Sequence, residues 1–159
     1  DISEHEILAQ NIVSATLWTE IREKAFELFR TGQQIAREQG LILVDTKYEF
    51  GLFEGELTLI DEVHTTDSSR YFYADGFEER QNNQQPQKQL SKEFLREWLM
   101  NNNFQGKEGQ VLPDLPDSFR IEVYERYAQL FKLLTGSTFS PTLIENINSD
   151  LETVFSPYF

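Results

Sequence analysis

Three charged side chains stand at alternate positions in one stretch of the chain: Asp45, Lys47 and Glu49. Side chains of a β-strand point alternately to its two faces, so these three would share one face. Leu41 and Leu43 precede them at alternate positions and would lie on the same face. We therefore expect a strand that leaves the hydrophobic core and carries its charges into a site. The opposite face would carry Ile42, Val44, Thr46, Tyr48 and Phe50.

The turn after this strand decides whether another acidic residue joins the charged face. Residues 53–55 fit a three-residue hairpin loop closed by Gly55 in the left-handed conformation. In that register Lys47 opposes Asp61, and Asp61 lies diagonal to Glu49. A two-residue loop would shift the register by one and turn Asp61 to the opposite face. The three-residue loop predicts that Glu49 and Asp61 converge beside Lys47.

Such a convergence has a specific chemistry. Two neighbouring carboxylates repel each other unless a cation lies between them. Oxygen ligands of this kind suit Mg²⁺, which keeps several waters and completes its shell with substrate phosphates. Lys47, and Arg70 after a short polar loop, would offset phosphate or carboxylate charge. The set suits phosphoryl transfer. The spacing leaves one alternative open, an exposed hairpin with a weak Lys47–Asp61 ion pair.

Two further polar groups could belong to the same site. Residues 64–70, HTTDSSR, form either a polar turn in which Asp67 caps a local amide or a loop that contacts a substrate. Lys92 and Arg96 are four residues apart, so they share one face of a predicted helix. They are either solvated or a short basic ridge for phosphate or carboxylate. The residue types do not decide between these alternatives.

Mainly helical segments surround this central stretch. Ser3 and Glu6 fit a capping box, and the helical pattern runs from 3 to 39 with a bend near 11–14, before Gly40. The other expected elements are a polar surface loop at 75–90, a helix at 91–102 opened by Ser91, an irregular connector at 103–115, a helix from 116 or 117 to 135, and a last helix at 141–153.

Composition excludes several classes of function. The chain has 159 residues, which is about one domain, and its net charge of −13 argues against nucleic acid or an anionic membrane surface as the main partner. It has no cysteine, so disulfides and thiolate metal sites are excluded. It shows neither a long apolar run nor a signal-peptide pattern, and we expect a cytoplasmic protein. His5 and His64 do not suggest a site.

The central motifs resemble those of the SAICAR synthetase (phosphoribosylaminoimidazole-succinocarboxamide synthase) family. Residues 41–51, LILVDTKYEFG, are similar to its first signature, and residues 67–70, DSSR, to its second. Residues 59–63 and 92–99 also resemble the family, in the same order and spacing. The resemblance extends from about Ile2 to Gly136. Thr66 departs from the pattern, because the family usually has proline there.

The resemblance implies a fold and a reaction. The fold would be α+β, the ATP-grasp-like C-terminal domain of the family, with a central antiparallel hairpin or sheet packed by helices over residues 1–159. The reaction would be an ATP-dependent ligation in purine biosynthesis. It joins L-aspartate to carboxyaminoimidazole ribotide (CAIR) through an acyl phosphate, with ATP and Mg²⁺ as cofactors. The family's N-terminal nucleotide-binding domain is missing from this chain, so the missing domain is an expected partner.

The resemblance also implies roles for particular residues. Glu49 and Asp61 match the ligands of Mg²⁺–ATP. Asp45 and Lys47 match catalytic positions that face the imidazole substrate and the transferring phosphate. The substrate-binding positions would be Asp67, Ser68, Ser69, Arg70, Lys92 and Arg96.

Two alternatives remain beside this assignment. Inositol polyphosphate kinases have a related fold and an Asp-x-Lys strand, although Glu49-Phe50-Gly51 and the DSSR loop fit the synthetase better. A non-catalytic fragment with an incomplete site is the other alternative. A homo-oligomer is left open.

Overall fold

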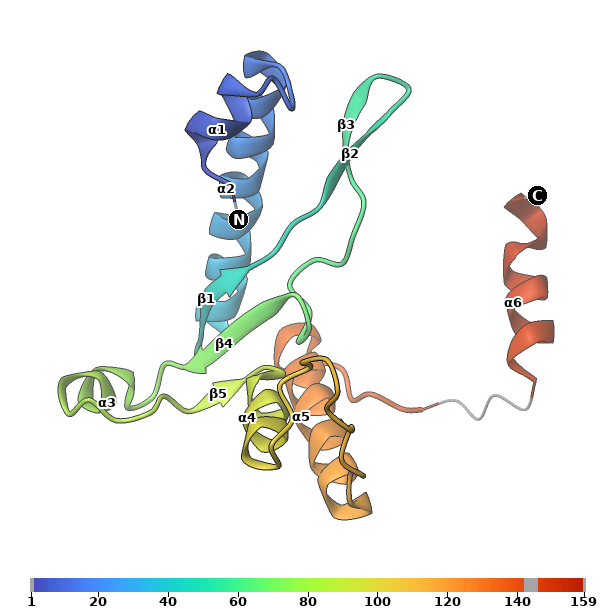
Figure 1. Cartoon of the computed structure of the whole chain (residues 1–159). Helices are drawn as coiled ribbons and strands as arrows, with labels where there is room; N and C mark the ends of the chain where they lie inside the picture. The colour runs from blue at the N-terminus through green and yellow to red at the C-terminus, as the bar shows by residue number, and fades with distance from the viewer. Residues whose placement is uncertain (1, 142–145, 159) are drawn as a thin grey trace.

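The structure is a computed structural model, and it describes residues 2–141 and 146–158. Figure 1 shows helices and short strands in a mixed arrangement. In chain order the elements are α1 (Glu4–Ala9), α2 (Ala15–Glu38), β1 (Leu41–Thr46), β2 (Phe50–Phe53), β3 (Glu56–Leu59), β4 (Ser69–Tyr73), α3 (Phe77–Asn82), β5 (Gln89–Leu90), α4 (Glu93–Asn101), α5 (Asp117–Thr135), α6 (Ile147–Phe155) and the short 3-10 helix η1 (Ser156–Tyr158).

The strands form two separate antiparallel sheets. One has three strands in the order β1-β4-β5, and the other is the β2–β3 hairpin. In Figure 1, α2 lies along β1, while α4 and α5 lie beyond β5. This arrangement confirms the expected α+β class, in which an antiparallel hairpin and sheet are packed by helices.

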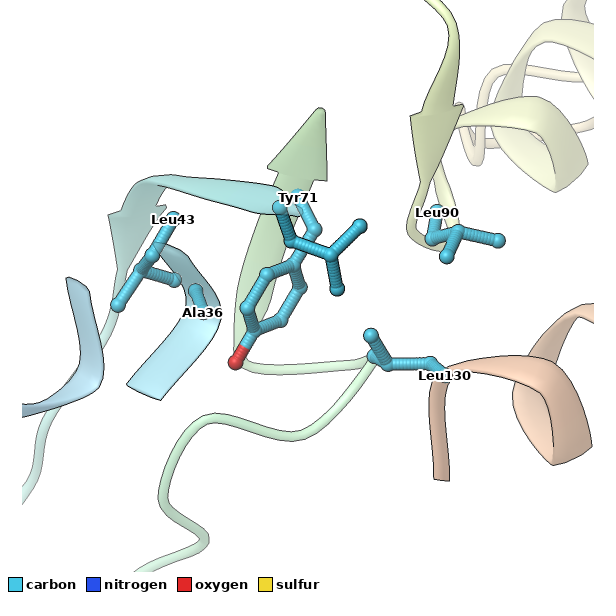
Figure 2. Close-up of a cluster of buried hydrophobic side chains, with 6 residues drawn as sticks. Ala36, Leu43, Tyr71, Leu90 and Leu130 are labelled. Carbon is cyan, nitrogen blue, oxygen red and sulfur yellow. The ribbon is translucent and has the colours of Figure 1, made fainter. Parts of the chain in front are cut away.

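A small hydrophobic core lies where α2, the three-stranded sheet and α5 meet. Figure 2 shows Tyr71 between Ala36 and Leu43 on one side and Leu90 and Leu130 on the other. Burying a leucine side chain stabilises a fold by about 1.5–3 kcal/mol, so these few residues carry much of the packing energy. The cluster consists of Ala36, Leu41, Leu43, Tyr71, Leu90 and Leu130, each at most 2% exposed.

Strand β1 is buried in its first half and exposed at Asp45. Leu41 and Leu43 are each 1% exposed, whereas Asp45 is exposed. A β-bulge falls between Leu43, which pairs with Tyr71, and Asp45, which pairs with Arg70. A bulge bends a strand and redirects the side chains that follow it. The predicted strand that leaves the core and exposes charged residues is therefore present, although it ends at Thr46.

The register of the hairpin differs from the expected one. Phe53 pairs with Glu56, and the loop between them is Glu54-Gly55, with φ values of 51° and 88°. These angles are those of a two-residue type I′ turn, whose twist matches that of the flanking strands. The expectation of a three-residue loop is wrong, because Glu54 also adopts the left-handed conformation. Residues 47–49 belong to neither sheet and form a link between β1 and β2.

The predicted caps of α1 and α5 are present, whereas α4 begins at Glu93 with Lys92, and not Ser91, at its N-cap position. Ser3 Oγ accepts a hydrogen bond from Glu6 N, and Glu6 Oε2 accepts one from Ser3 N, which confirms the capping box. The predicted bend separates α1 from α2, whose first turn is capped by Ser14. Gly136, with φ of 72°, ends α5 as expected, since glycine adopts this left-handed conformation freely.

Two segments differ from their predicted structures. Residues 75–90 are not wholly a loop, because they contain α3 and β5. Phe77 of α3 packs near Phe72 of β4, with ring centroids 6.1 Å apart, so tertiary contacts order this polar segment. The last helix was expected at 141–153, but α6 runs from Ile147 to Phe155 and Pro141 is not helical. Residues 142–145 lie outside the described residues. Figure 1 shows α6 apart from the core.

Among the described helices, none combines the length and the apolar character that crossing a membrane requires.

The buried end of β1 should hold the fold together. Replacing Leu43 with alanine should lower the free energy of unfolding by about 2–5 kcal/mol, because it leaves a cavity beside Tyr71. Urea denaturation followed by circular dichroism measures this loss. Leu52→Ala is the control, since Leu52 is 60% exposed. Equal losses in the two variants would contradict the position of the core.

Candidate functional site

Lys47 lies between two carboxylates. Its Nζ is 2.5 Å from Glu49 Oε1 and 3.3 Å from Asp61 Oδ2. The predicted convergence of the three side chains is therefore present, but it does not arise from the predicted register. Glu49 lies in the irregular link, and its carbonyl accepts a hydrogen bond of 3.0 Å from Ile60 N. That contact brings the segment carrying Asp61 beside the link.

The carboxylates and the lysine stabilise one another's charges. A hydrogen bond from the Glu62 backbone, and then the Lys47 ammonium, lower the pKa of Asp61. Glu49, followed by Asp61, raises the pKa of Lys47. All three side chains are at least one third exposed, so these ion pairs contribute little to stability. The arrangement is a charged face that is open to a ligand.

Glu49 and Asp61 could supply only the protein share of the ligands around a Mg²⁺ ion. Within residues 2–141 and 146–158, no group of three or more His, Asp or Glu side chains gathers as a metal site. Glu49 and Asp61 could offer two carboxylates, and Mg²⁺ commonly takes one or two carboxylates, with waters and substrate phosphates as its other ligands. The residues present therefore fit a metal that arrives with a phosphorylated substrate.

The two signature motifs meet across the three-stranded sheet. Arg70 Nη2 of β4 is 3.1 Å from Asp45 Oδ2 of β1, and the two residues are register partners. This pair begins just beyond the bulge, where the strand becomes exposed. It places a guanidinium beside the strand that leads to Lys47.

Hydrogen bonds fix the loop that precedes β4. The backbone N–H groups of Asp67 and Ser68 both donate to Thr65 Oγ1, at 3.3 and 3.2 Å, and Thr65 N donates to Ser68 Oγ at 3.1 Å. Ser69 Oγ lies 2.8 Å from Thr46 Oγ1 of β1. Thr66, where the resemblance implies a proline, is 7% exposed. Side-chain hydrogen bonds therefore order this loop without that proline, and the serines face inward.

Asp67 points away from its own loop. Its Oδ1 accepts a hydrogen bond of 2.7 Å from Tyr127 OH of α5, and Lys92 Nζ lies 4.0 Å from the same atom. Asp67 therefore does not cap a local amide. Burial, together with Asp67, raises the pKa of Tyr127. No sequence pattern indicates this contact, because Tyr127 lies 60 residues away and fits the apolar stripe of its helix.

Lys92 and Arg96 have different surroundings. Lys92 precedes α4 and reaches the loop, whereas Arg96 Nη1 lies 3.7 Å from Glu93 Oε2 on the helix itself. With Lys107 they line a groove of about 650 Å³, whose apolar lining residues are Leu95, Leu99, Met100 and Phe104. Lys92 thus lies beside Asp67, and both Lys92 and Arg96 line the groove.

Fold and site together define a class. The chain is an antiparallel α+β domain with an exposed face of paired carboxylates, a lysine and an arginine, which is the chemistry used to handle phosphorylated ligands. The model of the SAICAR synthetase family matches residues 1–111, and the chain belongs to that family.

The regions that match curated relatives cover most of this chain. The phosphoribosylaminoimidazole-succinocarboxamide synthase of Bacteroides fragilis is 50% identical over 152 residues, which are 96% of this chain and 48% of that protein. The synthase of Flavobacterium psychrophilum is 49% identical over 153 residues, with the same two coverages of 96% and 48%. The chain therefore spans about half the length of these relatives.

Solved structures confirm the fold. SAICAR synthase from Saccharomyces cerevisiae, solved with SAICAR, superimposes with a TM-score of 0.67 at 32% identity over 84% of this chain and 43% of that one. A type-2 SAICAR synthetase in complex with ADP gives a TM-score of 0.56 at 22% identity, over 81% of this chain and 42% of that one. The second likeness bears on the fold alone.

The Lys47 cluster makes a prediction about ionisation. Lys47→Met should raise the pKa of Asp61 towards its ordinary value, because a cation that stabilises the carboxylate is lost. The rise should be partial, since the Glu62 backbone hydrogen bond remains. Carbon-13 NMR of the side-chain carboxyl measures it. Lys24→Met, which removes the partner of Glu27 on α2, should leave Asp61 unchanged. An unchanged Asp61 in Lys47→Met would contradict the cluster.

The Tyr127–Asp67 contact makes a second prediction. Tyr127→Phe should destabilise the chain by about 1 kcal/mol, the usual contribution of one hydrogen bond. It should also accelerate amide hydrogen exchange in residues 65–68, because the loop loses its contact with α5. Tyr124→Phe is the matched control, since Tyr124 lies on the same helix and packs against Phe139. Equal exchange rates in both variants would show that the contact does not hold the loop.

Proposed function

We propose that this chain forms one wall of the active site of an ATP-dependent ligase that joins L-aspartate to CAIR. The observation that carries the proposal is the convergence of Glu49 and Asp61 on Lys47 in a chain that is 50% identical to a phosphoribosylaminoimidazole-succinocarboxamide synthase. ATP would phosphorylate the carboxylate of CAIR, and the amine of aspartate would then displace phosphate to form the amide of SAICAR.

Glu49 and Asp61 are the proposed holders of Mg²⁺–ATP. Two exposed carboxylates match the protein share of a Mg²⁺ shell. The bound ion would neutralise charge on the phosphates of the nucleotide. When the carboxylates hold a metal, Lys47 no longer has to neutralise them. Its ammonium can then contact the phosphoryl group that moves to CAIR, which is the role we propose for it.

The remaining charged residues are proposed to orient the substrates. Asp45 would face the imidazole of CAIR, and its contact with Arg70 fixes both side chains. Arg70, Lys92 and Arg96 supply cations for the phosphate of CAIR and the carboxylates of aspartate. Asp67 lies next to this group and is aligned by α5 and Lys92. Ser68 and Ser69, which face inward, would keep the loop in the binding conformation.

Completion of the site requires more polypeptide than this chain. It spans about half the length of its relatives, and a nucleotide-binding loop is not found in its sequence. We infer that an N-terminal nucleotide-binding domain of the same enzyme forms the opposite wall, with the reaction in the cytoplasm. The inositol phosphate kinase alternative is not favoured, because the relatives and solved neighbours are SAICAR synthases.

A chimera tests this function. The N-terminal half of the Bacteroides fragilis relative, joined to this chain, should release ADP only when both CAIR and L-aspartate are present. The 159-residue chain alone should show no turnover, because it contains one wall of the site. Coupled measurement of ADP and chromatography of SAICAR report both results. Release of ADP with an inositol phosphate and without aspartate would refute the ligase.

The carboxylates can be tested in the same chimera. Glu49→Gln and Asp61→Asn should each weaken Mg²⁺–ATP binding at least about tenfold, equivalent to about 1.4 kcal/mol, because each removes a charged ligand. Titration calorimetry measures the affinity. Glu56→Gln, an exposed change on the neighbouring β2–β3 hairpin, is the control. Unchanged binding in both site variants would remove these residues as ligands.

A further inference from the structure

Two rings meet where the link leaves the three-stranded sheet. Tyr48 OH lies 2.6 Å from His64 Nε2, and the rings pack edge to face with centroids 5.6 Å apart. Tyr48 is the central residue of the link, directly between Lys47 and Glu49. His64 lies in the segment between Asp61 and the loop before β4. This contact therefore joins the two segments that carry the charged face.

A glycine inside a helix accommodates the His64 ring. Gly32 is a buried residue of α2, and a Cβ atom added there would lie 2.3 Å from His64 Cε1 and 2.7 Å from His64 Nε2. Any other residue at this position would displace the ring. Glycine costs a helix interior about 1 kcal/mol relative to alanine, and the close approach of His64 accounts for its use here.

The core also holds the backbone of His64. Its φ of 56° lies in the left-handed region, which few residues with a side chain adopt. Its carbonyl accepts a hydrogen bond of 2.8 Å from Tyr71 OH, and Tyr71 is 1% exposed. The ring is thus fixed by α2 on one side and by β4 on another, before it reaches Tyr48.

The environment of His64 suits a neutral ring. It borders a cavity of about 360 Å³ that is lined mainly by apolar residues of α2 and α5, with the phenols of Tyr71 and Tyr127. Burial lowers the pKa of His64. A neutral imidazole keeps one nitrogen as acceptor and one as donor, so it can hydrogen-bond to a hydroxyl without a charge partner.

We propose that Tyr48 and His64 are positioning residues that fix the link 47–49, and with it Lys47 and Glu49, relative to Asp61. The link belongs to neither sheet, and two backbone hydrogen bonds hold its ends. Lys47 N donates to Ser68 O at 2.9 Å, and Glu49 O accepts from Ile60 N at 3.0 Å. The Tyr48–His64 contact holds its centre. The use of this geometry for a metal rests on the proposed function, whereas the contact itself does not.

The test uses the 159-residue chain and two measurements. Tyr48→Phe keeps the ring and removes the hydroxyl. It should accelerate amide exchange at residues 47–49 about tenfold, the effect of one hydrogen bond. It should also weaken Mn²⁺ binding several-fold, seen as reduced paramagnetic broadening of the Glu49 and Asp61 resonances. General destabilisation does not give this local signature. Tyr124→Phe is the control and should change neither measurement.

A second variant disturbs the same contact by displacing His64. Gly32→Ala should displace the His64 ring and give the same two changes, although alanine is the better helix former. If Gly32→Ala does not fold, His64→Phe replaces it, because phenylalanine keeps an aromatic ring and cannot bond to Tyr48 OH.

The outcomes separate this proposal from the proposed function. Unchanged exchange at 47–49 in Tyr48→Phe and in the second variant would overturn it, and so would faster exchange with full Mn²⁺ affinity. Wild-type chain that shows no Mn²⁺ broadening at Glu49 and Asp61 would refute the metal assignment instead. In that case faster exchange in both variants would still establish that the contact fixes the link.

Discussion

The burial of Leu41 and Leu43 fixes where the charged end of β1 lies. Each of these side chains contributes about 1.5–3 kcal/mol, whereas an exposed ion pair such as Asp45–Arg70 contributes about 0–1 kcal/mol. The core therefore holds the charged residues in place, and the charges do not hold the fold. A bulge after Leu43 then turns the strand, so that one continuous segment supplies both a core and a site.

The charged face is assembled from pairs that a ligand can replace. Lys47 and Arg70 each contact a carboxylate, and Lys92 lies at the outer limit of ion-pair distance from Asp67. Because all of these groups are partly exposed, an arriving anion or metal ion exchanges one partner for another and does not have to desolvate an isolated charge. On a chain of net charge −13, such pairing keeps cations available for anionic substrates.

Local patterns predicted α1, α2, α4 and α5 and the exposed charges, because capping boxes and strand alternation depend on neighbours in sequence, but they missed α3 and misplaced α6. They failed at Glu54, since nothing local distinguishes a glutamate that will adopt the left-handed conformation. The convergence on Lys47 survived that error because Glu49 lies outside the regular strands. Contacts between distant segments, such as that of Tyr127 with Asp67, do not produce a periodic pattern in the sequence. A tyrosine in an apolar stripe is equally compatible with core packing, and an aspartate in a polar segment is equally compatible with a solvated loop.

Several large apolar side chains of the hairpin and of α6 are exposed. Leu52 and Phe53 at the hairpin are 60% and 68% exposed, and α6 carries Ile147 and Val154 at 58% and 61%. Exposed apolar surface of this kind marks a contact with further protein when the residues are contiguous. In the function proposed above, the opposite wall of the site would face Lys47. Excluding water there would strengthen each charge interaction that is weak in the open face, because electrostatic energies rise as the local dielectric constant falls.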